Sequence, residues 1–228
     1  MDPEVPKEAE FPLARGRALV LAAVLIATDG WLSARYGLGV RVLVALSIVG
    51  LERLATRRPL RLTWGEWTVS LGNTVGTALV CAALVAVAAL VLLGAHKLTG
   101  FSFEHAPQNV RSRPDFWPYV GFACGLVPIA EELIYRGLLQ VELARAFGRW
   151  RAVWIAGPIF WTYHWWSYGG VTPLNHILAG WILAWSFERT RSLLAPTLLH
   201  ALGNLLIALI DLALLTYPET MSSLFGVH

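Results

Sequence analysis

The sequence predicts an all-α protein, a polytopic bundle of helices that crosses a membrane about seven times. Apolar residues make up 56% of the 228 residues and charged residues only 14%, and the mean hydropathy is +0.57. The apolar residues also gather in long runs. Such a chain is too apolar for an ordinary soluble domain. Its spans must be helical, because lipid offers no hydrogen-bond partners to the backbone.

Runs of roughly 18 to 25 apolar residues mark the predicted spans. The third run is long enough to tilt, whereas the second and sixth are short, so roughly six to eight spans fit the pattern. No repeat, linker or soluble domain interrupts the chain, which predicts a single integral membrane domain over residues 1–228. In chain order the runs are 18–32, 40–54, 69–95, 116–139, 153–168, 174–187 and 194–217.

The positive charges follow the predicted topology. With seven spans and a cytoplasmic N-terminus, twelve lysines and arginines lie on the cytoplasmic side and five on the opposite side. This bias satisfies the positive-inside rule. The net charge of +3 therefore reflects contact with the lipid bilayer and predicts no nucleic-acid partner. The Ala-, Leu- and Arg-rich composition is typical of a bacterial protein and favours the bacterial inner membrane.

Small residues recur at spacings that let helices approach closely. Gly72 with Gly76, and Gly121 with Gly125, are each four residues apart. Such pairs let two membrane helices pack backbone against backbone. We therefore expect close helix contacts at these four glycines.

Three ionisable residues interrupt the fourth apolar run: Glu131, Glu132 and Arg136. Charged groups at bilayer depth are costly and mark functional sites by default. Glu132 and Arg136 share a helix face, so they are expected to form an ion pair. Glu131 projects about 100° away and is left to face a cavity. The alternative is a buried ion pair that only fixes helix packing.

Polar residues also interrupt later runs. His164 lies in an aromatic stretch, and His200 and Asn204 share a face of the last span. Taken singly, they fit an interfacial histidine and an interhelical hydrogen bond. Together with Glu131 they form a set that is able to activate a water molecule and stabilise an oxyanion. His176, which follows a proline loop, is left out of this set.

Two questions about this set stay open at the sequence level. Glu131, His164 and His200 form a ligand set that zinc accepts, with a position left for water. The histidines lack a His-Glu-x-x-His arrangement, so a site without metal or other cofactor is preferred. Asp211 lies near the face of Asn204, where it could support the site or face the aqueous end of the helix.

The polar residues resemble the motifs of the CAAX protease and bacteriocin-processing family of intramembrane endopeptidases. That family has two adjacent glutamates with an arginine four residues after the second, then Phe-x-x-x-His, then His-x-x-x-Asn. In this sequence the motifs are Glu131, Glu132 and Arg136; Phe160 and His164; and His200 and Asn204. The resemblance runs from about residue 117 to residue 212, within the predicted catalytic core helices 115–217.

The resemblance implies a role for each matching residue. Glu131 would be the general base, acting with His164 on a water molecule, and His200 and Asn204 would stabilise the oxyanion. Glu132, Arg136 and Phe160 would support the site. The implied function is hydrolysis of a peptide bond in a membrane-anchored or lipid-modified protein or peptide. A myxosortase-like role in protein sorting is one option for a bacterial member.

Three other functions compete with this prediction. A zinc-dependent protease would use Glu131, His164 and His200 as ligands. A proton-coupled transporter would use the same groups as a relay, although paired half-repeats are not visible in the sequence. A non-catalytic membrane scaffold or immunity protein would keep the polar cluster for packing alone.

Overall fold

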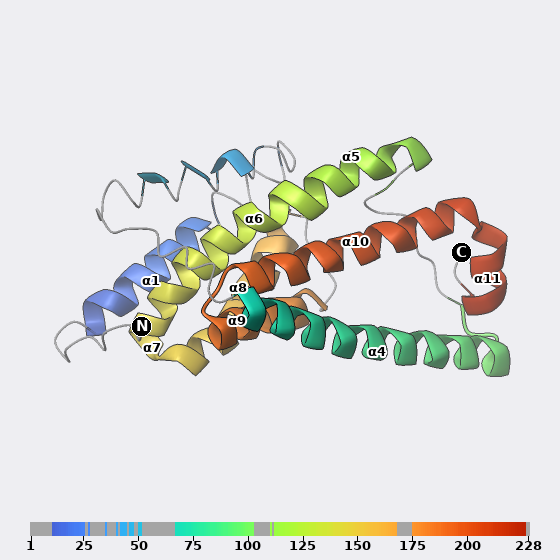
Figure 1. Ribbon diagram of the computed structural model, residues 1–228, viewed down its shortest axis with the longest axis horizontal. Coiled ribbons are helices and arrows are strands. Elements are labelled where there is room, and N and C mark those ends of the chain that lie inside the picture. Colours follow the sequence, from blue (N-terminus) through green and yellow to red (C-terminus); the bar gives the residue numbers. More distant parts are fainter. Residues whose placement is uncertain are drawn as a thin grey trace. The chain divides into compact units, whose positions relative to one another are not determined.

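The structure is a computed structural model that describes residues 11–25, 67–102, 112–167 and 175–226, with Val110 and isolated positions between 27 and 51. Within these residues every regular element is a helix (Figure 1), which confirms the predicted all-α class. The chain divides into two compact units. The first unit comprises Met1–Leu71 and Val127–Thr197, and the second comprises Gly72–Leu126 and Leu198–His228.

Helical backbone runs without a break from Phe116 to Phe147, where the sequence predicts a span over 116–139. Two stretches of this segment are π-helical, η4 and η5, and they flank the short helix that carries Glu131 and Glu132. Such wider turns are frequent at functional sites. The helices are α1 (Phe11–Leu25), α4 (Trp67–Thr99), η3 (Arg113–Asp115), α5 (Phe116–Gly121), η4 (Phe122–Leu126), α6 (Val127–Glu132), η5 (Leu133–Gln140), α7 (Val141–Phe147), α8 (Arg149–Ser167), α9 (Asn175–Thr190), α10 (Leu194–Thr216) and α11 (Pro218–Phe225).

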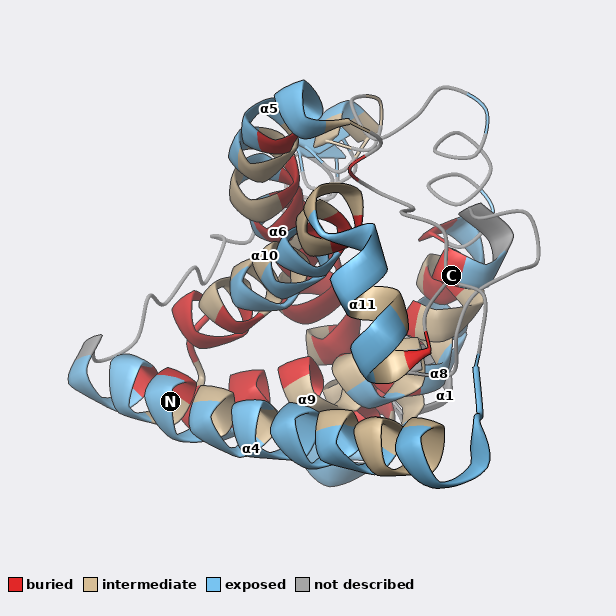
Figure 2. Ribbon diagram, turned by 90° about the vertical axis from the view of Figure 1, so that its right-hand side faces the viewer, coloured by how far each residue is buried: buried red, intermediate tan, exposed pale blue. Residues whose placement is uncertain are grey.

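Within the part of the chain that the structure describes, two helices are long and apolar enough to cross a membrane. They are Thr68–Thr99, with a mean hydropathy of 2.8, and Leu194–Thr216, with a mean hydropathy of 2.1. The helix α4 exposes most of its apolar side chains (Figure 2), among them Leu79, Leu84 and Leu90. A helix that presents leucines outward along its length suits lipid better than water.

Among the described residues no further helix meets the same criterion, so the count of seven is not confirmed. The runs predicted at 153–168 and 174–187 are the helices α8 and α9. The helix α9 has 16 residues, fewer than the about 20 needed for a straight crossing. In the N-terminal region, α1 begins at Phe11, seven residues before the predicted run 18–32. The run 40–54 is described only at scattered positions, and the rest of it lies outside the described residues.

The helices α8 and α9 approach closely at Gly157 and Gly180. A Cβ atom on Gly180 would lie 2.9 Å from Cα of Gly157. Pro158 has no N–H group, so the carbonyl of Trp154 loses its usual helical donor. Nε1 of Trp181 donates to that carbonyl at 2.9 Å and ties the two helices together. The two glycines therefore leave room for the close approach, and Pro158 frees the carbonyl that accepts the hydrogen bond between the helices.

The glycines singled out from sequence spacing do not make such contacts. Among the described residues, no atom lies within 4 Å of where a Cβ would stand on Gly72, Gly76, Gly121 or Gly125. That prediction was wrong. Spacing shows which residues share a face of a helix, but it does not show which helix comes against that face.

Candidate active site

The two glutamates end the helix α6, and Arg136 follows in η5. All three side chains are buried; Glu131 is 1% exposed and the other two are 0% exposed. Nε of Arg136 lies 3.1 Å from Oε2 of Glu132, so the ion pair expected from their spacing is present. Arg136 also donates from Nη2 to the carbonyl of Gly180 at 3.5 Å. The pair therefore anchors η5 to α9.

Phe160 of α8 connects this ion pair to His164. The guanidinium carbon of Arg136 lies 5.2 Å from the centre of the Phe160 ring, a cation–π distance. On the same helix the ring centres of Phe160 and His164 are 4.3 Å apart. The aromatic residue of the Phe-x-x-x-His motif is thus in contact with both a charged group and the imidazole.

His164 lies in the last turn of α8 and is 5% exposed. Its Nδ1 is 2.8 Å from the carbonyl oxygen of Phe160. Because a carbonyl oxygen only accepts, Nδ1 carries a proton and donates it. The other ring nitrogen, Nε2, faces Oε2 of Glu131 at 3.9 Å. In the neutral ring this nitrogen is an acceptor, so it is able to exchange a proton with the carboxyl group or with a molecule between them.

Tyr163 contacts the other carboxylate oxygen of Glu131. Its hydroxyl donates to Oε1 at 3.3 Å, and its side chain is fully buried. The Tyr163 ring packs against Tyr135, with ring centres 5.2 Å apart. Sequence reasoning missed Tyr163 because it was counted only as part of an aromatic stretch. Adjacent side chains on a helix point about 100° apart, so its position next to His164 gave no signal for the contact with Glu131.

His176 is a second residue that sequence reasoning left out. It lies in the first turn of α9, and its ring centre is 4.9 Å from that of His164. The helices α8 and α9 pack along each other, so the last turn of one meets the first turn of the next. Hairpin geometry was the signal that would have placed His176 beside His164.

His200, Asn204 and Asp211 lie on α10 in the second unit. Nδ2 of Asn204 donates to the carbonyl of Ala123 in η4 at 2.7 Å. Asp211 is buried, and its Oδ2 accepts from the backbone N–H of Val110 at 3.1 Å. Asp211 is therefore tied to the backbone in this unit. The convergence of His200 and Asn204 with Glu131 stays a prediction, and so do the roles of all the site residues.

A metal centre was the main alternative raised by the sequence. Among the residues that the structure describes, no group of three histidines, cysteines, aspartates or glutamates is arranged to hold a metal ion. The zinc set of Glu131, His164 and His200 combines residues of both units. Its assembly stays a prediction, and so does the metal-free site.

Exposed apolar side chains along α4, together with a buried cluster of ionisable residues, are typical of an integral membrane protein. Residues 113–206 match the family model described as type II CAAX prenyl endopeptidase Rce1-like. Over this region, which is less than half of the chain, the sequence is similar to the CAAX protease family of membrane-integral proteases. The matched region contains every predicted site residue. No curated protein and no solved structure matches the chain significantly.

Proposed function

We propose that this protein is an intramembrane endopeptidase in which Glu131 and His164 activate a water molecule. The observation that carries the proposal is the pairing of Oε2 of Glu131 with Nε2 of His164 at 3.9 Å in a buried setting. This distance is longer than a hydrogen bond and suits two groups that share a bridging water. The similarity to the CAAX prenyl endopeptidase family supports peptide-bond hydrolysis as the reaction.

The proposed reaction begins when Glu131 takes a proton from the water molecule, while Nε2 of His164 orients it. The hydroxide oxygen then attacks the carbonyl carbon of the peptide bond and forms a tetrahedral oxyanion. Side chains of His200 and Asn204 would donate hydrogen bonds to that oxygen. As the C–N bond breaks, Glu131 returns the proton to the leaving nitrogen, so that acid and amine products form.

The contacts around the two glutamates support different roles for them. Glu132 is paired with Arg136, whereas Glu131 is contacted by a neutral hydroxyl and an imidazole. An imidazole beside a carboxylate is able to take up or return a proton, which suits a general base. Glu132 and Arg136 would hold the shape of the site, together with Phe160.

The proposed substrate is a membrane-anchored or lipid-modified protein or peptide, because the family name refers to prenylated proteins. Its cleaved bond would have to reach a site among apolar helices. We place the protein in the bacterial inner membrane with about seven spans and a cytoplasmic N-terminus, on the basis of the arginine distribution and the apolar runs.

The test compares membrane proteins of cells that carry the wild-type chain or Glu131→Gln. Mass spectrometry of peptide termini should show new C-termini with the wild type that are absent with the variant. Glu219→Gln is the matched control, because Glu219 is an exposed acid on α11. Identical termini from wild type and a well-inserted Glu131→Gln variant would refute the proposal.

Cleavage of the substrate identified in this way also tests whether the enzyme needs a metal ion. Glu131-based hydrolysis is expected to continue after treatment with a chelator, and elemental analysis of the active enzyme should find less than one zinc ion per chain. A stoichiometric zinc ion whose removal stops turnover would show the zinc-dependent alternative instead.

A further inference from the structure

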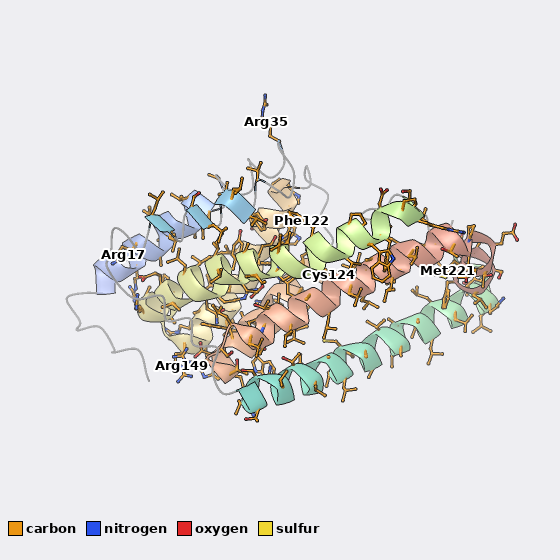
Figure 3. All side chains as sticks on the ribbon, turned by 45° about the horizontal axis from the view of Figure 1, so that its top comes forward. Arg17, Arg35, Phe122, Cys124, Arg149 and Met221 are labelled. Atoms are coloured by element: carbon orange, nitrogen blue, oxygen red, sulfur yellow. The ribbon has the colours of Figure 1, made fainter. Side chains whose placement is uncertain are left out.

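Seven arginines gather at one end of the first unit, where α1, α7, α8 and α9 meet. Arg15 of α1 donates to the carbonyl of Ala146 in α7 at 3.5 Å, and Arg149 of α8 pairs with Glu188 of α9. Figure 3 labels Arg17 and Arg149 at this end. We call this group the arginine face. Its members are Arg15, Arg17, Arg145, Arg149, Arg151, Arg189 and Arg191.

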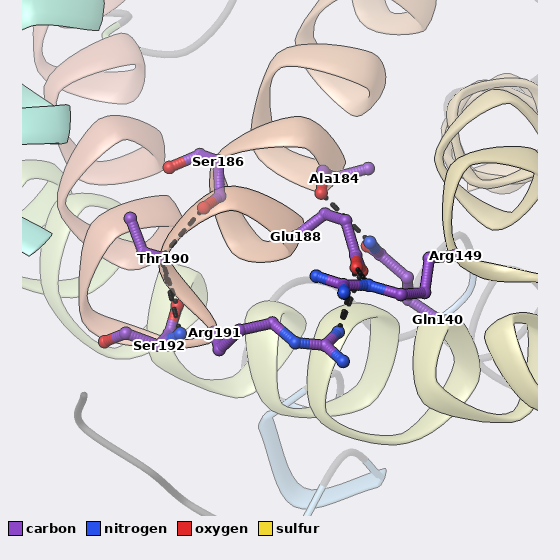
Figure 4. A network of polar contacts seen from close by, with 8 residues as sticks. All are labelled: Gln140, Arg149, Ala184, Ser186, Glu188, Thr190, Arg191 and Ser192. Atoms are coloured by element: carbon purple, nitrogen blue, oxygen red, sulfur yellow. Dashed lines mark hydrogen bonds and ion pairs between the residues drawn. The ribbon is translucent and has the colours of Figure 1, made fainter. Parts of the chain in front are cut away.

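Glu188 organises one half of the arginine face (Figure 4). Its side chain is fully buried and lies between Arg149 and Arg191. Nη1 of Arg191 is 3.0 Å from each carboxylate oxygen. Two cations around one buried anion leave a net positive charge. The guanidinium groups reach the surface, since the side chains of Arg149 and Arg191 are 42% and 34% exposed.

Glu142 repeats this arrangement in the other half. It is buried, forms an ion pair with Arg145, and has Arg17 at 3.9 Å. Again two arginines surround one carboxylate, and the side chain of Arg17 is 51% exposed. Glu142 and Glu188 both contact the arginine face. The residues named here comprise seven arginines and two glutamates, which makes this set positively charged.

The backbone at Arg191 provides a separate indication. This residue follows the end of α9 with a φ of 53°, the only positive φ of a non-glycine residue in the described chain. Glycine or asparagine normally occupies that position, because a side chain there is strained. A strained conformation that persists suggests that the side chain is required. The required feature here is a guanidinium placed at the end of the helix.

Two exposed tryptophans lie next to the arginines. Trp150 and Trp154, on the first turns of α8, are 56% and 65% exposed. Arg189 lies over the ring of Trp185, with 5.9 Å between its guanidinium carbon and the ring centre. Tryptophan in such a setting settles at the headgroup level of a bilayer. The arginine face is thus expected at the depth of lipid phosphates.

From these observations we infer that the arginine face is a binding site for the headgroups of anionic phospholipids. Guanidinium groups bind phosphate oxygens through paired hydrogen bonds, and the buried glutamates hold those groups in place. The inference concerns the lipid partner of the protein and is measured by lipid binding. Its outcome is therefore independent of the proposed proteolysis.

The experiment measures binding of short-chain phosphatidylglycerol and phosphatidylcholine to the full chain in neutral detergent, by native mass spectrometry. Phosphatidylglycerol should bind the wild type about tenfold more tightly. Arg191→Gly removes the guanidinium and suits the positive φ, so the variant should fold and bind phosphatidylglycerol about fivefold more weakly. Arg191→Lys retains the charge and should recover part of the loss. Arg113→Gln, an equal change of charge on η3, should bind like the wild type.

Three results would overturn the inference. The first is equal binding of the two lipids by the wild type, and the second is unchanged phosphatidylglycerol binding by a folded Arg191→Gly variant. The third uses inorganic phosphate as a competitor. If millimolar phosphate displaces the lipid completely, the site takes the free anion and not a lipid headgroup.

Discussion

The guanidinium carbon of Arg136 lies 5.2 Å from the centre of the Phe160 ring, and this contact joins two motifs that are separated in the sequence. On one side Arg136 pairs with Glu132. On the other side Phe160 packs against His164, which faces Glu131. The supporting residues and the proposed base therefore form one connected cluster in the first unit. A change at Glu132 or Arg136 is expected to reach His164 through the Phe160 ring.

Replacing one partner of the Glu132–Arg136 pair should destabilise the protein strongly. Arg136→Ala takes away the cation that pairs with a fully buried carboxylate, and such losses cost about 3–5 kcal/mol. The double variant Glu132→Met/Arg136→Met removes both charges at similar volume and should recover much of that loss. Thermal unfolding in detergent compares the variants. A single variant as stable as the wild type would contradict the burial of this pair.

Local geometry explains what the sequence predicted well. The Glu132–Arg136 pair depends only on a separation of four residues in a helical segment, and the structure contains it. The apolar runs also predicted the positions of α4, α8, α9 and α10, because a long run of apolar residues marks where a membrane helix lies in the sequence. The π-helical stretches around Glu131 were not predicted, since a wider helical turn leaves no periodic signal in so short a segment.

Tertiary contacts explain what the sequence missed. Tyr163 and His176 join the site because α8 packs along α9 and against η5, and no spacing within one helix encodes that arrangement. The same reason accounts for the wrong choice of glycines. The close approach occurs at Gly157 and Gly180, because the fold brings α8 and α9 together there.

Gly180→Ala should weaken the contact between α8 and α9. Its new Cβ would lie 2.9 Å from the Gly157 backbone, which has no flexible end that could move aside. We expect overpacking to cost about 1–3 kcal/mol. Gly16→Ala is the matched control, because its Cβ would meet no described atom within 4 Å and alanine favours a helix. Melting temperatures should fall for Gly180→Ala and stay or rise for Gly16→Ala; a reversed order would contradict the close approach.

His176 is expected to orient His164 through ring packing. Their ring centres are 4.9 Å apart, and contacts of this kind contribute about 0.5–1.5 kcal/mol. His176→Leu should therefore lower kcat roughly twofold to tenfold, with little change in KM. His176→Phe restores a ring without a titratable group and should recover most of the activity. If His176→Phe is as impaired as His176→Leu, the imidazole acts through its proton and not through its shape.

Tyr163 is expected to position Glu131 for proton transfer. Its hydroxyl is 3.3 Å from Oε1, and a hydrogen bond to a charged group contributes about 1.5–3 kcal/mol. Tyr163→Phe removes only that hydroxyl. Because the bond orients the base and does not touch the bulk of the substrate, kcat should fall roughly tenfold to a hundredfold while KM changes little.

The matched control for Tyr163 is Tyr135→Phe, which removes a hydroxyl from the adjoining buried ring. Kinetics with the substrate identified by its altered terminus should separate the two variants, because a general loosening of the aromatic cluster would affect both. Thermal unfolding is expected to shift by a similar small amount in each. If kcat falls equally in the two variants, or if Tyr163→Phe raises KM alone, the hydroxyl of Tyr163 does not position the base.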